Sequence, residues 1–145
     1  MNMDPSSSPG QPLQVIGRYA LFGALAAGGM ATVHLGRLIG PAGFSRTVAI
    51  KRLHEQYAAD PEFVAGFLDE ARLAARIRHP NVVPTLDVVA TQGQLFLVME
   101  YVQGESVARL LKLLKARDSL MPMHVAVATV AGALHGLHAA HEARN

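Results

Sequence analysis

The stretch Thr47-Val-Ala-Ile-Lys51 is a short β-branched run that ends in a lysine, and the rest of the chain is best understood by working outward from it. Because side chains alternate between the two faces of a strand, Val48 and Ile50 share one face while Ala49 and Lys51 share the other. A lysine beside a small alanine can face a pocket and reach a phosphate group. A single strand lysine is more often an ordinary exposed residue, so its neighbours must decide between the two interpretations.

Glu70 is the acidic residue that best fits as a partner of this lysine. It lies on a predicted helix over residues 60–78, on the same face as the apolar residues Phe63 and Phe67. A carboxylate among core residues is costly unless it is paired. We therefore expect Glu70 to hold the ammonium group of Lys51.

The remaining pattern consists of short apolar runs broken by Gly- and Pro-containing turns, which is typical of antiparallel strands. It predicts three strands before the helix, two strands after it, and two final helices. The predicted strands are Tyr19–Leu25, Ala31–Leu38, Arg46–Leu53, Val82–Val89 and Gln94–Val102, and the final helices are Ser106–Ala116 and Met123–Ala143. Residues 1–14, rich in Ser, Pro and Gly, are expected to be a disordered leader.

Two segments of this pattern have the features of nucleotide contacts. Residues 25–33 (LAAGGMATV) form a glycine-containing turn whose backbone can lie over phosphates, although a plain hairpin turn explains its glycines equally well. Residues 95–106 form a strand that runs into a glycine turn and a helix. There, Glu100 and Tyr101 either mark a strand end that reaches solvent or form a hinge whose backbone pairs with the edge of a flat heterocycle.

The composition excludes several classes of function. The chain has 145 residues, no Cys and a formal net charge of +2, and its basic residues are scattered. Without Cys there is no disulfide framework and no thiolate metal site, and so weak a charge does not indicate a nucleic-acid partner. The uncharged stretch Tyr19–Val33 is shorter than the roughly 17–25 residues of a membrane helix. We therefore expect a cytoplasmic chain with no membrane segment.

Three histidines at three-residue steps, His135, His138 and His141, form the other conspicuous pattern. Such a series can indicate a metal-binding helix face. The outer pair is spread over roughly 120° of the helix, however, so we expect half-buried helix residues and no metal site.

In this order and spacing, the segments resemble a eukaryotic-type serine/threonine protein kinase of the kind that bacteria encode. Residues 25–33 look like the Gly-rich loop, and Val48-Ala-Ile-Lys51 matches the VAIK strand motif. Glu70, ten residues before the proline of an HPNV segment, is similar to the glutamate of helix C. Met99-Glu-Tyr-Val102 looks like the gatekeeper and hinge.

The resemblance covers the chain from about Tyr19 to its last residue and implies an α+β, protein-kinase-like fold. Residues 15–102 would form the small lobe, a five-stranded antiparallel sheet with helix C. Residues 103–145 would form the hinge exit and the first two helices of an incomplete large lobe.

The same resemblance implies roles for individual residues. Lys51 and Glu70 would be the catalytic pair, with Lys51 contacting the α/β-phosphates of ATP. Backbone groups of Glu100 and Val102 would meet the base edge, and Ser106 would lie near the ribose. The nucleotide-binding residues that it implies are Leu25, Gly28, Val33, Ala49, Lys51, Met99, Glu100, Val102 and Ser106. It also implies magnesium, whose protein ligands are not in this chain, and a protein substrate.

The departures from the family pattern leave two hypotheses open. Ala26 and Ala31 replace the first and third glycines of the loop, and the chain contains no H-R-D loop and no D-F-G motif. The first hypothesis is the ATP-binding segment of a serine/threonine kinase, inactive alone because those motifs are absent. The alternative is a stand-alone degenerate kinase fold that binds a nucleotide or a partner. The apolar residues of the last two helices further predict a poorly soluble or oligomeric isolated chain.

Overall fold

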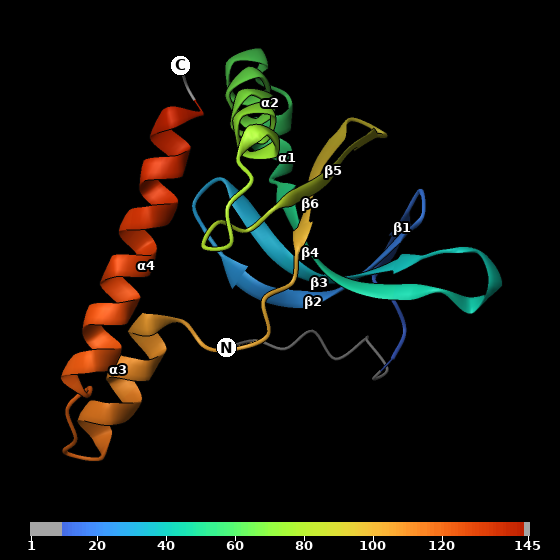
Figure 1. Ribbon diagram of the computed structural model, residues 1–145. Coiled ribbons are helices and arrows are strands. Elements are labelled where there is room, and N and C mark those ends of the chain that lie inside the picture. Colours follow the sequence, from blue (N-terminus) through green and yellow to red (C-terminus); the bar gives the residue numbers. More distant parts are fainter. Residues whose placement is uncertain (1–9, 144–145) are drawn as a thin grey trace. The chain divides into compact units, whose positions relative to one another are not determined.

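The computed structural model describes residues 10–143, which form two compact units (Figure 1). The first unit contains the chain up to Ala75 together with Pro84–Tyr101. The second contains Arg76–Val83 and the chain from Val102 onward. The first nine residues of the predicted leader lie outside the described residues.

The first unit is built on a six-stranded antiparallel sheet with the strand order β1-β2-β3-β4-β6-β5. Its strands are β1 (Gln14–Ile16), β2 (Tyr19–Ala27), β3 (Ala31–Ile39), β4 (Ser45–Leu53), β5 (Thr85–Thr91) and β6 (Gln94–Glu100), and a 3-10 turn, η1 (Pro41–Gly43), joins β3 to β4. The predicted fold class is confirmed, but the sheet has six strands rather than five. The extra strand is β1, which begins inside the predicted leader, at Gln14.

The sheet curls so that strands distant in its order meet. The hydroxyl of Tyr19 on β2 donates a hydrogen bond to Asp87 on β5 at 2.8 Å, and Gln14 on β1 donates to Gln94 at 3.2 Å. The concave side encloses a core in which every member is at least 98% buried. This core contains Ile16, Tyr19, Leu21, Val48, Ile50, Phe96 and Val98.

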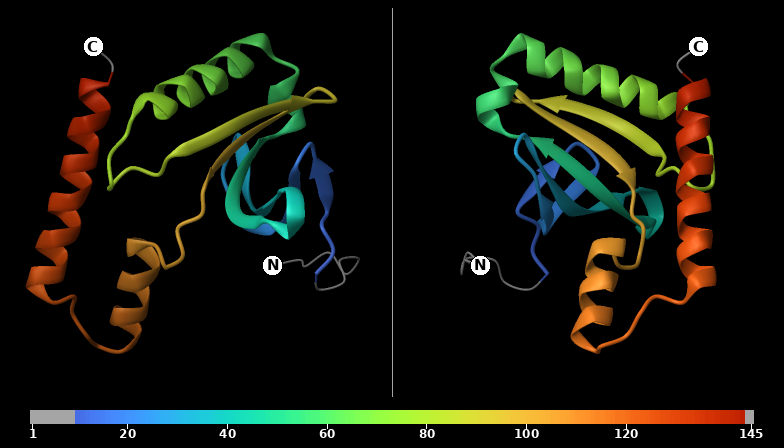
Figure 2. Two further views of the ribbon diagram at one scale, coloured as in Figure 1. Left: turned by 45° about the vertical axis from the view of Figure 1, so that its right-hand side comes forward. Right: turned by 90° about the vertical axis from the view of Figure 1, so that its left-hand side faces the viewer.

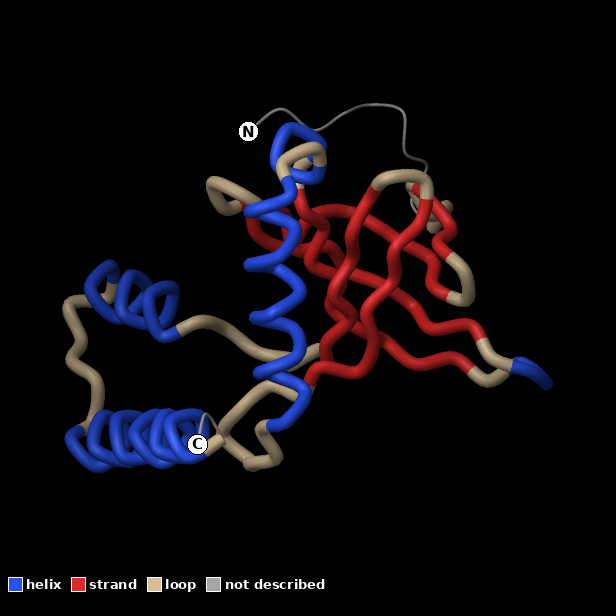
Figure 3. Tube along the Cα trace, turned by 90° about the horizontal axis from the view of Figure 1, so that it is seen from above, coloured by secondary structure: helices blue, strands red, loops and turns tan. Residues whose placement is uncertain are grey.

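Helices α1 (Glu55–Ala58) and α2 (Pro61–Arg76) follow β4. The carboxylate of Asp60 accepts a hydrogen bond from the Glu62 amide at 2.9 Å, which caps the N-terminus of α2. Helix α2 lies across the strands (Figure 3) and forms with them a second core. That core contains Leu53, Phe67, Ala71, Leu95 and Leu97.

The second unit contains α3 (Val107–Ala116) and α4 (Met123–Glu142), at the two predicted helical positions (Figure 2). The hydroxyl of Ser106 caps α3 by accepting from the Arg109 amide at 3.2 Å. The segment 76–83 is fastened to α4, because the Asn81 side chain donates to the Gly132 carbonyl at 2.9 Å. A Cβ at Gly136 would stand 2.8 Å from the Asn81 carbonyl oxygen, so this contact requires glycine.

Candidate functional site

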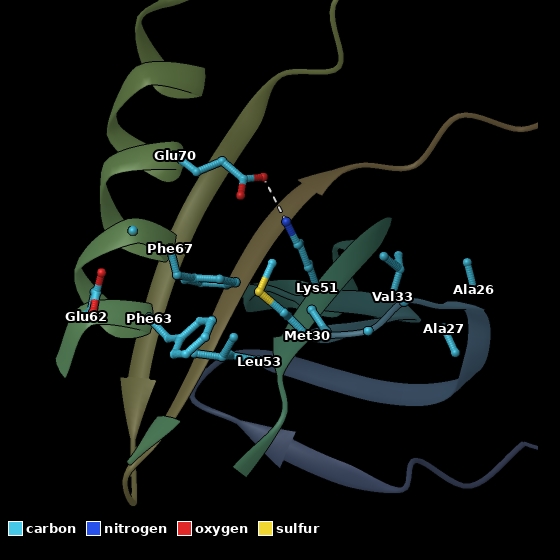
Figure 4. A pocket seen from close by; sticks show the side chains of 14 residues that line it. Ala26, Ala27, Met30, Val33, Lys51, Leu53, Glu62, Phe63, Phe67 and Glu70 are labelled. Carbon is cyan, nitrogen blue, oxygen red and sulfur yellow. Dashed lines mark hydrogen bonds and ion pairs between the residues drawn. The ribbon is translucent and has the colours of Figure 1, made fainter. Parts of the chain in front are cut away.

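The centre of the candidate site is an ion pair between β4 and α2. Lys51 Nζ lies 2.8 Å from Glu70 Oε1, the pairing that the sequence predicts (Figure 4). Lys51 projects from the face of β4 that it shares with Ala49, away from the fully buried side chains of Val48 and Ile50. The strand therefore places the ammonium group of Lys51 on the side of the sheet that α2 covers.

The surroundings of this ion pair differ from the sequence-based expectation. The Glu70 side chain is 58% exposed and that of Lys51 is 25% exposed, so the carboxylate is not embedded in the core. The core face of α2 is instead formed by Phe67 and Ala71, on either side of Glu70 in the sequence. An exposed ion pair contributes little stability, about 0–1 kcal/mol, so this pair matters mainly for where it holds the ammonium group.

Phe67 is a contact of the lysine that sequence reasoning missed. Lys51 Nζ lies 5.6 Å from the centroid of the Phe67 ring, which is within cation–π range. Phe67 and Glu70 are three residues apart on α2 and so point in neighbouring directions. The helix thus holds the ammonium with an aromatic face and a carboxylate together.

The glycine-containing turn connects β2 to β3. The Gly28 amide donates to the Ala31 carbonyl at 2.9 Å, which closes the turn. The register of β2 against β3 shifts between Leu21 and Ala26, so the strand is irregular where it enters the turn. The side chain of Met30, at the far end of the turn, points toward Phe67 and the cavity (Figure 4).

A cavity of about 820 Å³ lies between this turn, β4 and α2. The residues that line it are Ala26, Ala27, Gly28, Gly29, Met30, Ala31, Val33, Lys51, Leu53, Glu62, Phe63, Gly66, Phe67 and Glu70. Four predicted site residues are therefore brought together: Gly28, Val33, Lys51 and Glu70. Met30, Leu53, Phe63 and Gly66 were not predicted, because their approach depends on how α2 packs against the sheet.

Four other predicted residues of the first unit do not line this cavity. Ala49 and Met99 are cross-strand partners on β4 and β6, and Leu25 on β2 is 48% exposed. Glu100 ends β6, where its amide donates to the Pro84 carbonyl at 3.1 Å and its carboxylate lies 3.5 Å from Arg46. The amide of Glu100 is thus engaged within the fold, and the contact expected between its backbone and the edge of a base stays a prediction.

The last two predicted residues, Val102 and Ser106, belong to the second unit. Val102 is 65% exposed, and the Ser106 hydroxyl serves as the helix cap described above. The ribose contact expected for Ser106 stays a prediction.

Within residues 10–143, no group of three or more His, Cys, Asp or Glu side chains is placed to hold a metal ion. His135, His138 and His141 of α4 are exposed, whereas they were expected from the sequence to be half-buried.

Comparison with known proteins identifies the family. The model of the protein kinase domain matches residues 19–144, so the chain belongs to the protein kinase domain family. The chain is 41% identical over 133 residues to the tyrosine-protein kinase MasK of Myxococcus xanthus, covering 92% of this chain and 21% of that protein. It is 36% identical over 135 residues to the serine/threonine-protein kinase PknB of Mycobacterium leprae, covering 90% and 21%. The crystal structure of the Mycobacterium tuberculosis PknI kinase domain matches with a TM-score of 0.70 and 29% identity, over 89% of this chain and 49% of that one.

These matches confirm the sequence-based identification of an N-terminal portion of a kinase domain. The chain spans about a fifth of the length of the two curated relatives and about half of the PknI kinase domain. Among the described residues, α4 is long and apolar enough to cross a membrane by length and composition alone. It lies inside the matched region, which favours a helix of the large lobe, and the absence of a membrane segment stays a prediction.

Proposed function

We propose that this chain binds ATP and forms the nucleotide-binding part of a protein kinase that phosphorylates serine or threonine hydroxyls. The observation that carries the proposal is the ion pair of 2.8 Å between Lys51 and Glu70, placed in a cavity beside the glycine-containing turn. We extend the proposal to a protein substrate, which the family implies, and to a cytoplasmic location, which is predicted from the sequence.

The residues of the site fit the phosphate end of a nucleotide. The cavity is within the size range of small-molecule sites, and its one cationic group is held by a carboxylate and an aromatic ring. In this role Lys51 binds the α/β-phosphates, Glu70 and Phe67 orient the ammonium, and the turn covers the phosphates with its backbone. Magnesium would neutralise phosphate charge when bound, and the described residues offer no cluster of ligands for it.

The proposal includes a preference for serine and threonine as the residues that accept the phosphoryl group. It is supported by the similarity to PknB, which is named a serine/threonine kinase. MasK, which is 41% identical to this chain, is named a tyrosine kinase, so tyrosine is the competing acceptor. Phosphoamino-acid analysis of a protein substrate phosphorylated by the full-length protein that contains this chain decides between them: phosphoserine or phosphothreonine is expected, and phosphotyrosine alone contradicts the preference.

Nucleotide binding is tested by calorimetric titration with magnesium and ADP. Lys51→Met is expected to weaken binding by about tenfold or more, because a charge-assisted contact to phosphate is worth roughly 1.5–3 kcal/mol. Glu70→Gln should weaken it less, since the lysine charge remains. Lys112→Met makes the same substitution at an exposed position of α3 and is the matched control.

Two outcomes separate the kinase proposal from the alternative of a binding module. If the wild-type chain fails to bind the nucleotide, or if Lys51→Met binds as well as Lys112→Met, the nucleotide site is refuted. If the full-length protein that contains this chain binds ADP through Lys51 but transfers no phosphoryl group to any protein substrate, the degenerate, binding-only fold is favoured instead.

A further inference from the structure

His54 connects the glycine-containing turn to the helices that follow β4. It is the residue directly after β4 and precedes the first residue of α1. It does not line the cavity that contains Lys51 and Glu70. Its contacts nevertheless reach both walls of that cavity.

Toward the turn, His54 makes two hydrogen bonds. Its backbone amide donates to the Met30 carbonyl at 2.9 Å, and its ring Nε2 shares a hydrogen bond of 2.9 Å with the Thr32 hydroxyl. Met30 and Thr32 belong to the second limb of the turn, where the chain enters β3. Within the described residues, no side chain forms a hydrogen bond to the backbone of Gly28 or Gly29.

Toward the helices, His54 acts through its carbonyl and its ring. The carbonyl accepts hydrogen bonds from the amides of Tyr57 at 2.9 Å and Ala58 at 3.0 Å, which begin α1. The His54 ring lies 6.4 Å from the Tyr57 ring, and the Tyr57 ring lies 4.7 Å from that of Phe63 on α2. A continuous set of contacts therefore runs from the turn to the helix that carries Glu70.

The neighbours of His54 are engaged elsewhere. A second, smaller cavity of about 340 Å³ is lined by strand residues that alternate with Val33 and Lys51 and so face the opposite side of the sheet; its lining residues are Thr32, His34, Arg52, His54, Glu55 and Gln56. Within it, the ring of His34 bonds to the Phe22 carbonyl at 3.0 Å, and Arg52 pairs with Glu55 at 3.0 Å. Within this group, it is the imidazole of His54 that bonds to the Thr32 hydroxyl next to the turn.

We propose that His54 is a positioning residue for the nucleotide site, which holds the second limb of the turn at a fixed height over the phosphates. The inference rests on the proposed nucleotide-binding function. Because residues 30–32 are anchored through both backbone and side chain, the turn meets the phosphates with less conformational freedom to lose. Losing the His54–Thr32 bond removes the side-chain anchor of that limb, while its backbone pairing with β4, Lys51 and Glu70 stay in place.

The test is a double-mutant cycle on the affinity of the full chain for ADP with magnesium. His54→Phe keeps an aromatic ring beside Tyr57 and removes the bond to Thr32, and Thr32→Val removes the same bond from the other side. Each is expected to weaken binding by about threefold to tenfold, the range of one net hydrogen bond. The double variant should lose no more than either single variant, because both remove one interaction.

Two further variants make the result specific. His54→Gln retains a polar group near the position of Nε2 and should bind within about twofold of the wild type. His34→Phe removes the other imidazole of the smaller cavity and is the matched control, which should leave ADP affinity unchanged. Melting temperatures without nucleotide show which variants are folded, and Thr32→Val carries the test if His54→Phe is not.

The outcomes distinguish this inference from the function on which it rests. A wild-type chain that does not bind ADP refutes the proposed function and the inference together. A wild-type chain that binds, with the His54 and Thr32 variants binding equally well, overturns the inference alone. Fully additive losses in the double variant, or a His54→Gln loss as large as that of His54→Phe, also overturn it.

Discussion

The ammonium of Lys51 lies over the ring of Phe67, a residue that is itself only 5% exposed. Phe67→Leu keeps an apolar side chain in the core but removes the aromatic face. We expect it to weaken ADP binding by about twofold to fivefold, since a cation–π contact of this kind is worth roughly 0.5–1 kcal/mol. Calorimetric titration of both chains with ADP and magnesium measures the change.

The same substitution also lowers stability by about 1–2 kcal/mol, so a control must separate the two effects. Phe96→Leu makes an identical change in the other core, where Phe96 is completely buried. It should lower the melting temperature at least as much while leaving ADP affinity within about twofold of the wild type. Equal losses of affinity in both variants would show that Phe67 acts only through stability.

Tyr19 makes the stability of the fold depend on pH in the alkaline range. Burial of the phenol, and then its hydrogen bond to Asp87, raise the pKa of Tyr19 above its ordinary value of about 10. A group with a raised pKa in the folded state contributes its full stabilisation below its unfolded pKa and loses it as pH rises through the folded pKa. The free energy of unfolding should therefore fall as pH rises beyond about 10.

Tyr19→Phe tests this dependence. At neutral pH the variant should be less stable by about 1 kcal/mol, because the hydrogen bond to Asp87 is lost. Between about pH 9 and pH 11 its unfolding free energy should change less than that of the wild type, because the titrating group is gone. Urea denaturation across this range measures both, and parallel pH profiles for the two chains would contradict the assignment to Tyr19.

Among the elements, those with long periodic patterns were predicted and the short ones were not. The strands of the β3–β4 hairpin and helix α2 were predicted from side-chain alternation, from apolar runs broken by turns, and from helical spacing. Strand β1, with three residues, and helix α1, with four, are too short for any period to be visible in the sequence. They form because of their neighbours, as when β1 pairs with β2 in antiparallel register.

The candidate site likewise contains some residues that were predicted from the sequence and others that were not. Lys51 and Glu70 were paired from the sequence because strand alternation and helix spacing each fix a direction. The contacts of Phe67 and His54 depend on tertiary packing between segments that no local pattern relates. Exposure of the Glu70 carboxylate was also not predicted, because its helix face alone does not tell how far the sheet extends beneath it.

Gly36, in the middle of β3, is required by the packing of the hairpin. A Cβ at this position would stand 2.4 Å and 2.7 Å from side-chain carbons of Ile50 and 3.0 Å from Val48, both of which are fully buried. Gly36→Ala should therefore destabilise the fold by about 1–3 kcal/mol through overpacking. Urea denaturation measures this, with Gly23→Ala on β2 as the matched control.

Gly23 differs from Gly36 in its surroundings and not in its element type. A Cβ at Gly23 would meet no atom within 4 Å, and this residue is exposed. Gly23→Ala should leave stability unchanged or raise it slightly, because alanine loses less conformational freedom on folding. If Gly36→Ala were equally harmless, the core beneath the hairpin would have to be less tightly packed than described.

At the scale of the whole molecule, α4 presents a stripe of apolar side chains to solvent. Val127, Val130, Leu134 and Leu137 recur at helical spacing and are each more than half exposed. Such stripes favour association between molecules. We expect the 145-residue chain on its own to form oligomers, seen as a sedimentation coefficient that rises with concentration.

A charge placed in this stripe should oppose association. Leu134→Glu is expected to shift the chain toward a monomer, because a carboxylate is costly to bury between apolar faces. Leu120→Glu makes the same substitution at an isolated position that is 92% exposed, and should leave the oligomer unchanged. A wild-type chain that sediments as a monomer at every concentration would show that the stripe does not drive association. Loss of the oligomer in both variants would point to net charge rather than to α4.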